Sequence, residues 1–179
     1  MPGVIALLDD ANAARVEALW DAMGREFGVP RGYPGAVPHI SFHLGSHDVE
    51  AAAETIVRGV SRETPPFTVH SAGLGVFGGP VPVLYLTVGR SPEASKLATV
   101  LTERLAAAGF PSTDPYFTAD KWVPHITIAH KNLEAVELGP LLAWLVDQPL
   151  AWEIPLGSLS IARETDIGAE ILATFPLGG

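Results

Sequence analysis

The chain contains one five-residue pattern twice, and each copy carries a histidine followed two positions later by a hydroxyl. The copies are Val37–Ser41 (VPHIS) and Val123–Thr127 (VPHIT). Near neutral pH a neutral imidazole can take a proton from water or a ribose hydroxyl, and a protonated imidazole can donate to a leaving oxygen. Hydroxyl groups can hold the non-bridging oxygens of a phosphate. The two copies together could therefore perform acid–base chemistry on a phosphodiester.

Both patterns begin segments that alternate polar and apolar residues, which is typical of a β-strand with one buried face. On the polar faces, His39 lies beside Ser41 and His43, and His125 lies beside Thr127. One such motif alone is usually an ordinary polar pair at a sheet edge. Two motifs at matching places suggest that a pseudo-two-fold axis brings the polar faces together. We predict His39 and His125 as the catalytic pair and Ser41 and Thr127 as phosphate ligands.

The order of the predicted elements repeats along the chain. Apolar spacing predicts strands at 4–8, 39–44, 67–76, 83–88, 125–129, 151–162 and 170–175. It predicts helices at 12–27, 49–60 and 92–108, and a fourth from Asn132 that Gly139–Pro140 kinks or splits. We expect a single bilobal α+β domain over residues 1–179, with approximate halves 1–80 and 81–179 and with helices outside two sheets.

The paired motifs His39–Phe42 (HISF) and His125–Ile128 (HITI) resemble those of the two-histidine (2H) phosphoesterases. This family includes RNA 2′,3′-cyclic phosphodiesterases and 2′-5′ RNA ligase-like proteins, and the closing stretch SLSIARETDIGAEILATFPL is similar to the family's last hairpin. The resemblance implies pseudo-two-fold symmetry, two antiparallel-rich sheets and a site in a central groove. It also implies metal-independent hydrolysis of a cyclic phosphate, commonly leaving a 2′-phosphate, with His125 as base and His39 as acid. The residues alone leave those two roles open.

Composition and charge limit the partners. Hydrophobic residues make up 47% of the chain and charged residues 17%, which indicates a folded globular protein. The net charge is −9, and no basic stripe is visible, although proteins that follow long nucleic acids normally carry one. The charge balance therefore favours a small phosphate ligand over a long nucleic acid. Together with this balance, the resemblance implies a nucleotide or a short RNA with a cyclic phosphate as partner. The paired-histidine chemistry requires no cofactor.

Several residues near the motifs are possible substrate contacts. Tyr33, Tyr116 and Phe117 lie in predicted loops that lead into the histidine strands, where an aromatic ring could stack on a nucleobase or simply pack the loop. Lys131 could reach a phosphate from the rim of the site, or could be a solvated surface charge. His43 shares the predicted polar face with His39, so we include it among the possible contacts.

Other patterns argue against a metal or dinucleotide site. His39 and His43 are too far apart on a strand to share one ion unaided, no acid lies between them, and cysteine is absent, so we expect no metal. His130 points away from His125 if that strand is regular. The segment Gly73–Gly78 matches the dinucleotide fingerprint by its letters, but a strand-like run follows it instead of a helix. We therefore interpret it as a glycine-rich turn.

The first residues lack the basic region of a signal peptide, and no apolar run is long enough to span a membrane. These features predict a cytoplasmic protein with no membrane partner. A monomer suffices, because an intramolecular two-fold supplies both histidines. Two alternatives remain open: a nucleotide- or phosphate-binding module without turnover, or the same chemistry on 2′-5′ oligonucleotides or cyclic dinucleotides.

Overall fold

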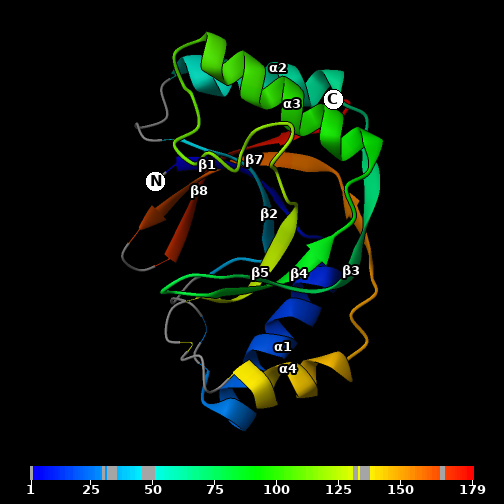
Figure 1. Cartoon of the computed structure of the whole chain (residues 1–179). Coiled ribbons are helices and arrows are strands. Elements are labelled where there is room, and N and C mark those ends of the chain that lie inside the picture. Colours follow the sequence, from blue (N-terminus) through cyan, green and yellow to red (C-terminus); the bar gives the residue numbers. More distant parts are fainter. Residues whose placement is uncertain are drawn as a thin grey trace.

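Two antiparallel four-stranded sheets lie face to face between two pairs of helices (Figure 1). This computed structural model describes residues 2–29, 31, 36–45, 51–130, 133, 138–165 and 168–179. The strands are β1 (Pro2–Leu7), β2 (His39–Leu44), β3 (Phe67–Phe77), β4 (Val83–Val88), β5 (His125–His130), β6 (Glu153–Leu156), β7 (Ser158–Thr165) and β8 (Gly168–Pro176). The helices are α1 (Asp10–Phe27), α2 (Ala51–Glu63), α3 (Pro92–Ala107) and α4 (Leu138–Val146). The expected α+β class, with helices outside two sheets, is confirmed.

The two histidine strands occupy equivalent edge positions. The first sheet has the order β2-β1-β7-β8 and the second the order β5-β4-β3-β6. Helix α1 follows β1 but packs against β5 of the second sheet, whereas α3 follows β4 but packs against β2 of the first. Each helix therefore crosses to the other sheet and covers its outer face (Figure 1). This exchange brings the edge strands β2 and β5 against each other in the middle of the molecule.

The expected continuous strand at 151–162 is two strands in different sheets. Strand β6 pairs with β3 in the second sheet, and β7 pairs with β1 in the first. Gly157 lies between them. The sequence shows apolar alternation on both sides of this glycine, but alternation reports which face is buried and says nothing about which strand is the hydrogen-bonding partner. Neither sheet is built from one half of the chain.

Gly139 and Pro140 lie at the start of the fourth helix. Helix α4 starts at Leu138, so Gly139 and Pro140 lie in its first turn and not at a kink. Proline is tolerated there because the first-turn N–H groups have no partner within the helix. The predicted start at Asn132 lies outside the described residues. The segment Gly73–Gly78 also differs from the expected turn, because most of it belongs to β3, which continues to Phe77.

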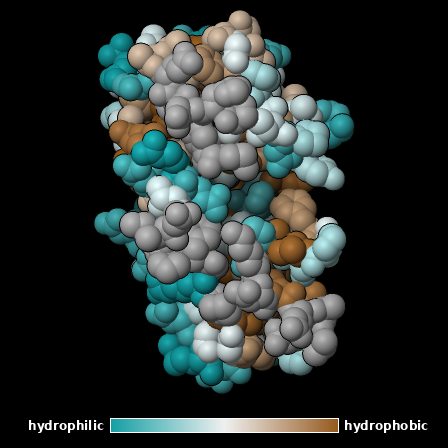
Figure 2. Space-filling model, turned by 90° about the vertical axis from the view of Figure 1, so that its left-hand side faces the viewer, coloured by the Kyte–Doolittle hydropathy of each residue, from teal (hydrophilic) through white to brown (hydrophobic). Residues whose placement is uncertain are grey.

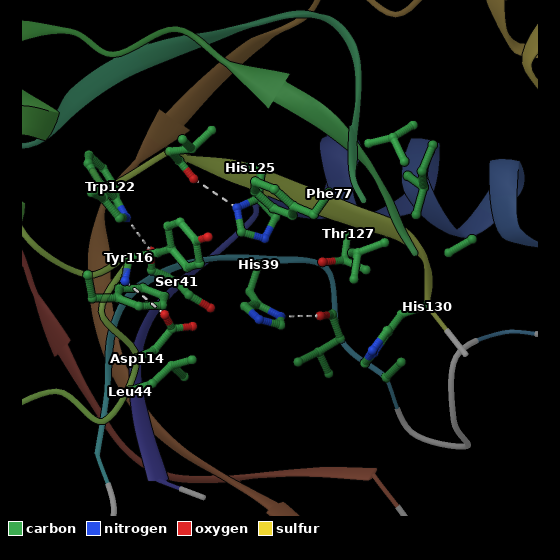
Figure 3. A pocket seen from close by; sticks show the side chains of 18 of the residues that line it. His39, Ser41, Leu44, Phe77, Asp114, Tyr116, Trp122, His125, Thr127 and His130 are labelled. Carbon is green, nitrogen blue, oxygen red and sulfur yellow. Dashed lines mark hydrogen bonds between the residues drawn. The ribbon is translucent and has the colours of Figure 1, made fainter. Parts of the chain in front are cut away.

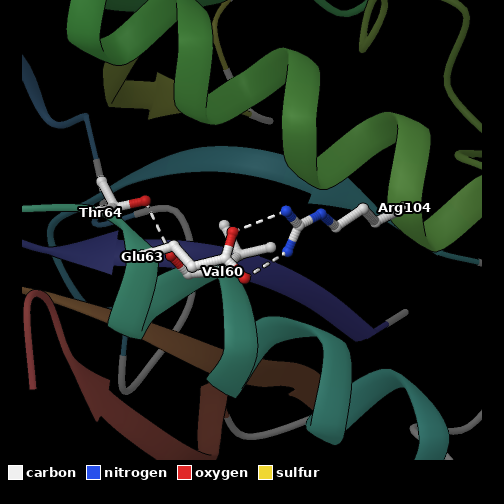
Figure 4. A network of polar contacts seen from close by, with 4 residues as sticks. All are labelled: Val60, Glu63, Thr64 and Arg104. Atoms are coloured by element: carbon white, nitrogen blue, oxygen red, sulfur yellow. Dashed lines mark hydrogen bonds and ion pairs between the residues drawn. The ribbon is translucent and has the colours of Figure 1, made fainter.

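An ion pair joins the two helices over the first sheet (Figure 4). The Arg104 guanidinium of α3 donates to both Glu63 carboxylate oxygens of α2, at 3.0 and 2.6 Å. Beside it, the Thr64 hydroxyl donates to the Val60 carbonyl at 2.8 Å and satisfies an acceptor at the end of α2. Both charged side chains are exposed, so the pair adds little stability in water.

No helix in the described part of the chain has the length and apolar character needed to cross a membrane.

Candidate active site

A groove between the two sheets brings the four predicted site residues together (Figure 3). His39 and Ser41 enter from β2, and His125 and Thr127 from β5. The cavity measures about 630 Å³, which is within the range of small-molecule sites. Seen from the side, the molecule is hollowed between its upper and lower parts (Figure 2). The predicted convergence of the two motifs is therefore present in the structure.

Each motif histidine is anchored by the same local hydrogen bond. The Nδ1 atom of His39 lies 2.7 Å from the Val37 carbonyl oxygen, and that of His125 lies 2.8 Å from the Val123 carbonyl oxygen. Because a carbonyl oxygen can only accept, Nδ1 must carry the hydrogen and donate it. This bond selects one tautomer for both rings and leaves Nε2 as the nitrogen that can exchange a proton with a ligand.

The two imidazoles interact electrostatically. Burial lowers the pKa of both His39 and His125, and in each case a hydrogen bond to the backbone opposes that change. Positive charge on His39 lowers the pKa of His125 further, whereas the Asp114 carboxylate raises it. Protonation of one ring therefore disfavours protonation of the other. A pair with one protonated and one neutral imidazole is the arrangement that acid–base catalysis needs.

A β-bulge follows the hydroxyl residue in the first motif. Across the strand pair, Ile5 lies opposite Ser41 but Val4 lies opposite His43, so Phe42 is the extra residue. A bulge shifts the alternation of side chains by one position. His43 consequently turns into the interior, with 4% exposure, and Leu44 lines the groove in its place. The expectation that His43 faces the substrate beside His39 is corrected by this bulge.

The second motif contains the matching bulge. Tyr85 lies opposite Thr127 but Leu84 lies opposite Ala129, so Ile128 is the extra residue. The shift turns His130 toward the groove, where it forms part of the wall. The expectation that His130 points away from the site assumed a regular strand and is also corrected. Alternation alone gave no signal for either bulge.

His43 is buried without a hydrogen bond at either ring nitrogen among the described residues. Burial lowers its pKa from the ordinary value of 6.5, and the nearby backbone of Phe110 only partly opposes this change. A folded state that resists protonation binds fewer protons than the unfolded state just below pH 6.5. Its stability therefore falls as the pH decreases through this range. The lowered pKa values of His39 and His125 change the stability with pH in the same direction.

We expect His43→Leu to reduce the loss of stability on acidification. Removing one such histidine should lower the slope of unfolding free energy against pH, just below pH 6.5, by at most about 1.4 kcal/mol per pH unit. Urea unfolding at several pH values measures this slope. His70→Leu, at an exposed histidine with 64% side-chain exposure, is the matched control. An unchanged slope in His43→Leu would contradict the interpretation.

Trp122 connects the two motif strands directly. Its indole Nε1 donates to the Ser41 carbonyl oxygen at 3.0 Å, and its ring packs against Phe42 with centroids 5.1 Å apart. The indole is buried, with 3% exposure. Because Trp122 precedes His125 by three residues and Ser41 follows His39 by two, this contact fixes the position of one histidine strand relative to the other.

The segment before Trp122 also forms one side of the groove. The Thr113 N–H donates to the Leu44 carbonyl at 3.0 Å, which attaches this segment to the free edge of β2. Asp114 lines the groove and accepts from the Tyr116 N–H at 2.8 Å. Tyr116 is 67% exposed at the rim, whereas Phe117 is a buried wall residue with 7% exposure. Two other predicted contacts, Tyr33 and Lys131, lie outside the described residues.

We expect Trp122→Phe to lower kcat for phosphodiester hydrolysis more than it raises KM. The phenyl ring keeps much of the packing with Phe42 but leaves the Ser41 carbonyl without its donor, at a stability cost of about 1–3 kcal/mol. Steady-state kinetics and thermal unfolding would measure both effects. Trp144→Phe is the control, since Trp144 packs on Phe27 at the other side of the second sheet. An equal decrease of kcat in Trp122→Phe and Trp144→Phe would indicate a general effect on folding.

Within the described ranges, no group of three or more His, Asp or Glu side chains is arranged to hold a metal ion.

Comparison with known proteins identifies the family. The family model of the 2′-5′ RNA ligase superfamily matches residues 8–166, and the chain belongs to this superfamily. A Bacillus cytotoxicus protein with a provisional phosphoesterase name is 34% identical over 101 residues, which cover 55% of this chain and 54% of that protein. A similarly named Bacillus mycoides protein is 28% identical over 145 residues, or 79% of each chain.

Solved structures share the fold. A Thermus thermophilus protein aligns with a TM-score of 0.70 at 17% identity, covering 99% of this chain and 98% of that one. Escherichia coli LigT, in a complex with 3′-AMP, aligns with a TM-score of 0.63, also at 17% identity and with the same coverage. The resemblance to the two-histidine phosphoesterases is confirmed, and a role in phosphoester chemistry is supported.

Proposed function

We propose that this protein hydrolyses the 2′,3′-cyclic phosphate of nucleotides or short RNA ends. One observation carries the proposal: two imidazoles anchored through Nδ1 line a single cavity and interact through their charges, each with Nε2 left for proton exchange. A cyclic phosphodiester needs one group to activate water and another to protonate the leaving oxygen. The paired histidines match that requirement.

The reaction follows from the two protonation states. The neutral imidazole accepts a proton at Nε2 from water as the water oxygen attacks phosphorus. The protonated imidazole donates from Nε2 to the ribose oxygen whose bond to phosphorus breaks. The product is a ribose with one free hydroxyl and one phosphate monoester, and proton exchange with solvent restores the pair. The Ser41 and Thr127 hydroxyls donate to the non-bridging oxygens. The family resemblance favours His125 as base and a 2′-phosphate product.

The charge of the groove supports a small substrate. None of the described residues that line it is lysine or arginine, and Asp114 contributes a negative charge. The hydrogen bonds of imidazoles and hydroxyls can hold a single phosphate, but the repeated phosphates of a long RNA would meet an acidic protein of net charge −9. The nucleotide in the LigT complex is a ligand of the size that we propose here.

We expect His39→Ala and His125→Ala each to reduce kcat/KM about 10²- to 10⁴-fold on 2′,3′-cyclic nucleotides, and the double variant to be little worse than either. The wild-type pH–rate profile should be bell-shaped, and activity should persist in EDTA. Product position is read by phosphorus NMR. His70→Ala, outside the groove, is the control. Full turnover by either single variant would exclude this mechanism, and tight binding without turnover would indicate a binding module instead.

We expect Asp114→Asn to move one limb of the pH–rate profile to lower pH. The carboxylate raises the pKa of His125, so its removal lets His125 lose its proton at lower pH. If His125 is the base, the acidic limb moves; if it is the acid, the alkaline limb moves. The variant therefore assigns the role of His125. Asp120→Asn removes an exposed carboxylate from the same segment and is the control. No movement of either limb would contradict the predicted coupling.

A further inference from the structure

His125 lies against two stacked aromatic rings of the second sheet (Figure 3 shows His125 and Phe77). The Phe77 ring centroid is 5.0 Å from that of His125, at an interplanar angle of 82°. The Tyr85 centroid is 5.1 Å from it, at 57°. Phe77 and Tyr85 stack on each other at 4.2 Å. The two separations from His125 are in the range where ring pairs attract beyond simple burial, and the three rings form one packed unit.

The position of Tyr85 depends on the absence of a side chain at Gly75. The two residues lie directly opposite each other on β4 and β3. A Cβ atom placed on Gly75 would lie 2.4 Å from two Tyr85 ring carbons and 2.6 Å from its hydroxyl oxygen. The φ of Gly75 is not among the positive values found in this chain, so the glycine supplies space and not an unusual backbone conformation. The Tyr85 ring therefore lies across the bare backbone of β3.

The first motif has no such arrangement at the equivalent positions. Tyr85 lies opposite Thr127, and the residue opposite Ser41 on β1 is Ile5. The next strand from Tyr85 presents Gly75, whereas the next strand from Ile5 presents Ser160, which is fully buried. An aliphatic side chain and a serine thus replace the tyrosine and the glycine. Two motifs with the same pentapeptide pattern consequently place their imidazoles in different surroundings.

We propose that Tyr85 is a positioning residue that sets the orientation of the His125 ring, and that Gly75 is glycine because this tyrosine must lie over it. The inference rests on the proposed function for the role of His125. The hydrogen bond to Val123 fixes the Nδ1 side of the imidazole, and the aromatic rings restrict rotation of the rest. Together these contacts direct Nε2 toward the groove.

The test is a double-mutant cycle on Gly75 and Tyr85. Gly75→Ala should push the tyrosine ring toward His125 and lower kcat about ten- to a hundredfold, with KM changed by less than about twofold. Tyr85→Leu should lower kcat about two- to tenfold. Tyr85→Phe should retain nearly full activity because the ring remains. Gly75→Ala/Tyr85→Leu should be no worse than Tyr85→Leu alone, because the added methyl no longer meets a ring.

NMR of the His125 imidazole tests the positioning role of Tyr85 separately from protein stability and from the proposed reaction. The imidazole NMR signals and titration of His125 should change in Gly75→Ala and Tyr85→Leu and return in Tyr85→Phe. Gly59→Ala, where a Cβ meets nothing within 4 Å, is the control. Unchanged His125 signals in Tyr85→Leu, or additive losses in the double variant, would overturn the inference. Absence of turnover in the wild type would contradict the proposed function alone, since the NMR comparison needs no substrate.

Discussion

The site depends on the close approach of two edge strands, β2 and β5. Catalysis by a histidine pair requires both Nε2 atoms to reach one phosphate, and neither sheet can satisfy this alone. The crossing of α1 and α3 to opposite sheets brings the strands together, and the Trp122 hydrogen bond to the Ser41 carbonyl fixes one strand against the other. A contact between a side chain and the backbone thus links the two motifs within a few residues of each histidine.

The two His-x-hydroxyl motifs share several structural features, but their surroundings differ. Both copies share the Nδ1 anchor, the hydroxyl and the bulge. After the bulge, one strand presents Leu44 to the groove and the other presents His130. Asp114 raises the pKa of His125, and two aromatic rings contact it. In the reaction that we propose, acid and base differ in protonation, and such asymmetry between the two imidazoles suits that difference.

The bulge in β2 also buries a titratable side chain. His43 belongs to the same strand as His39, and its side chain is buried. Burial lowers the pKa of this imidazole, so the folded protein resists its protonation. The bulge that places His43 there also turns Leu44 toward the groove, so the shape of the cavity and the burial of this imidazole have a single structural origin.

The sequence by itself indicated two His-x-hydroxyl strands with apolar opposite faces, in two series of similar elements, and an α+β fold. Tertiary structure alone decided that residues 153–156 and 158–165 belong to different sheets, that His43 turns inward and His130 toward the groove, and that Tyr85 lies over Gly75. The physical reason is that side-chain periodicity reports local backbone geometry. Bulges, sheet partners and cross-strand contacts depend on hydrogen bonds between segments far apart in the chain.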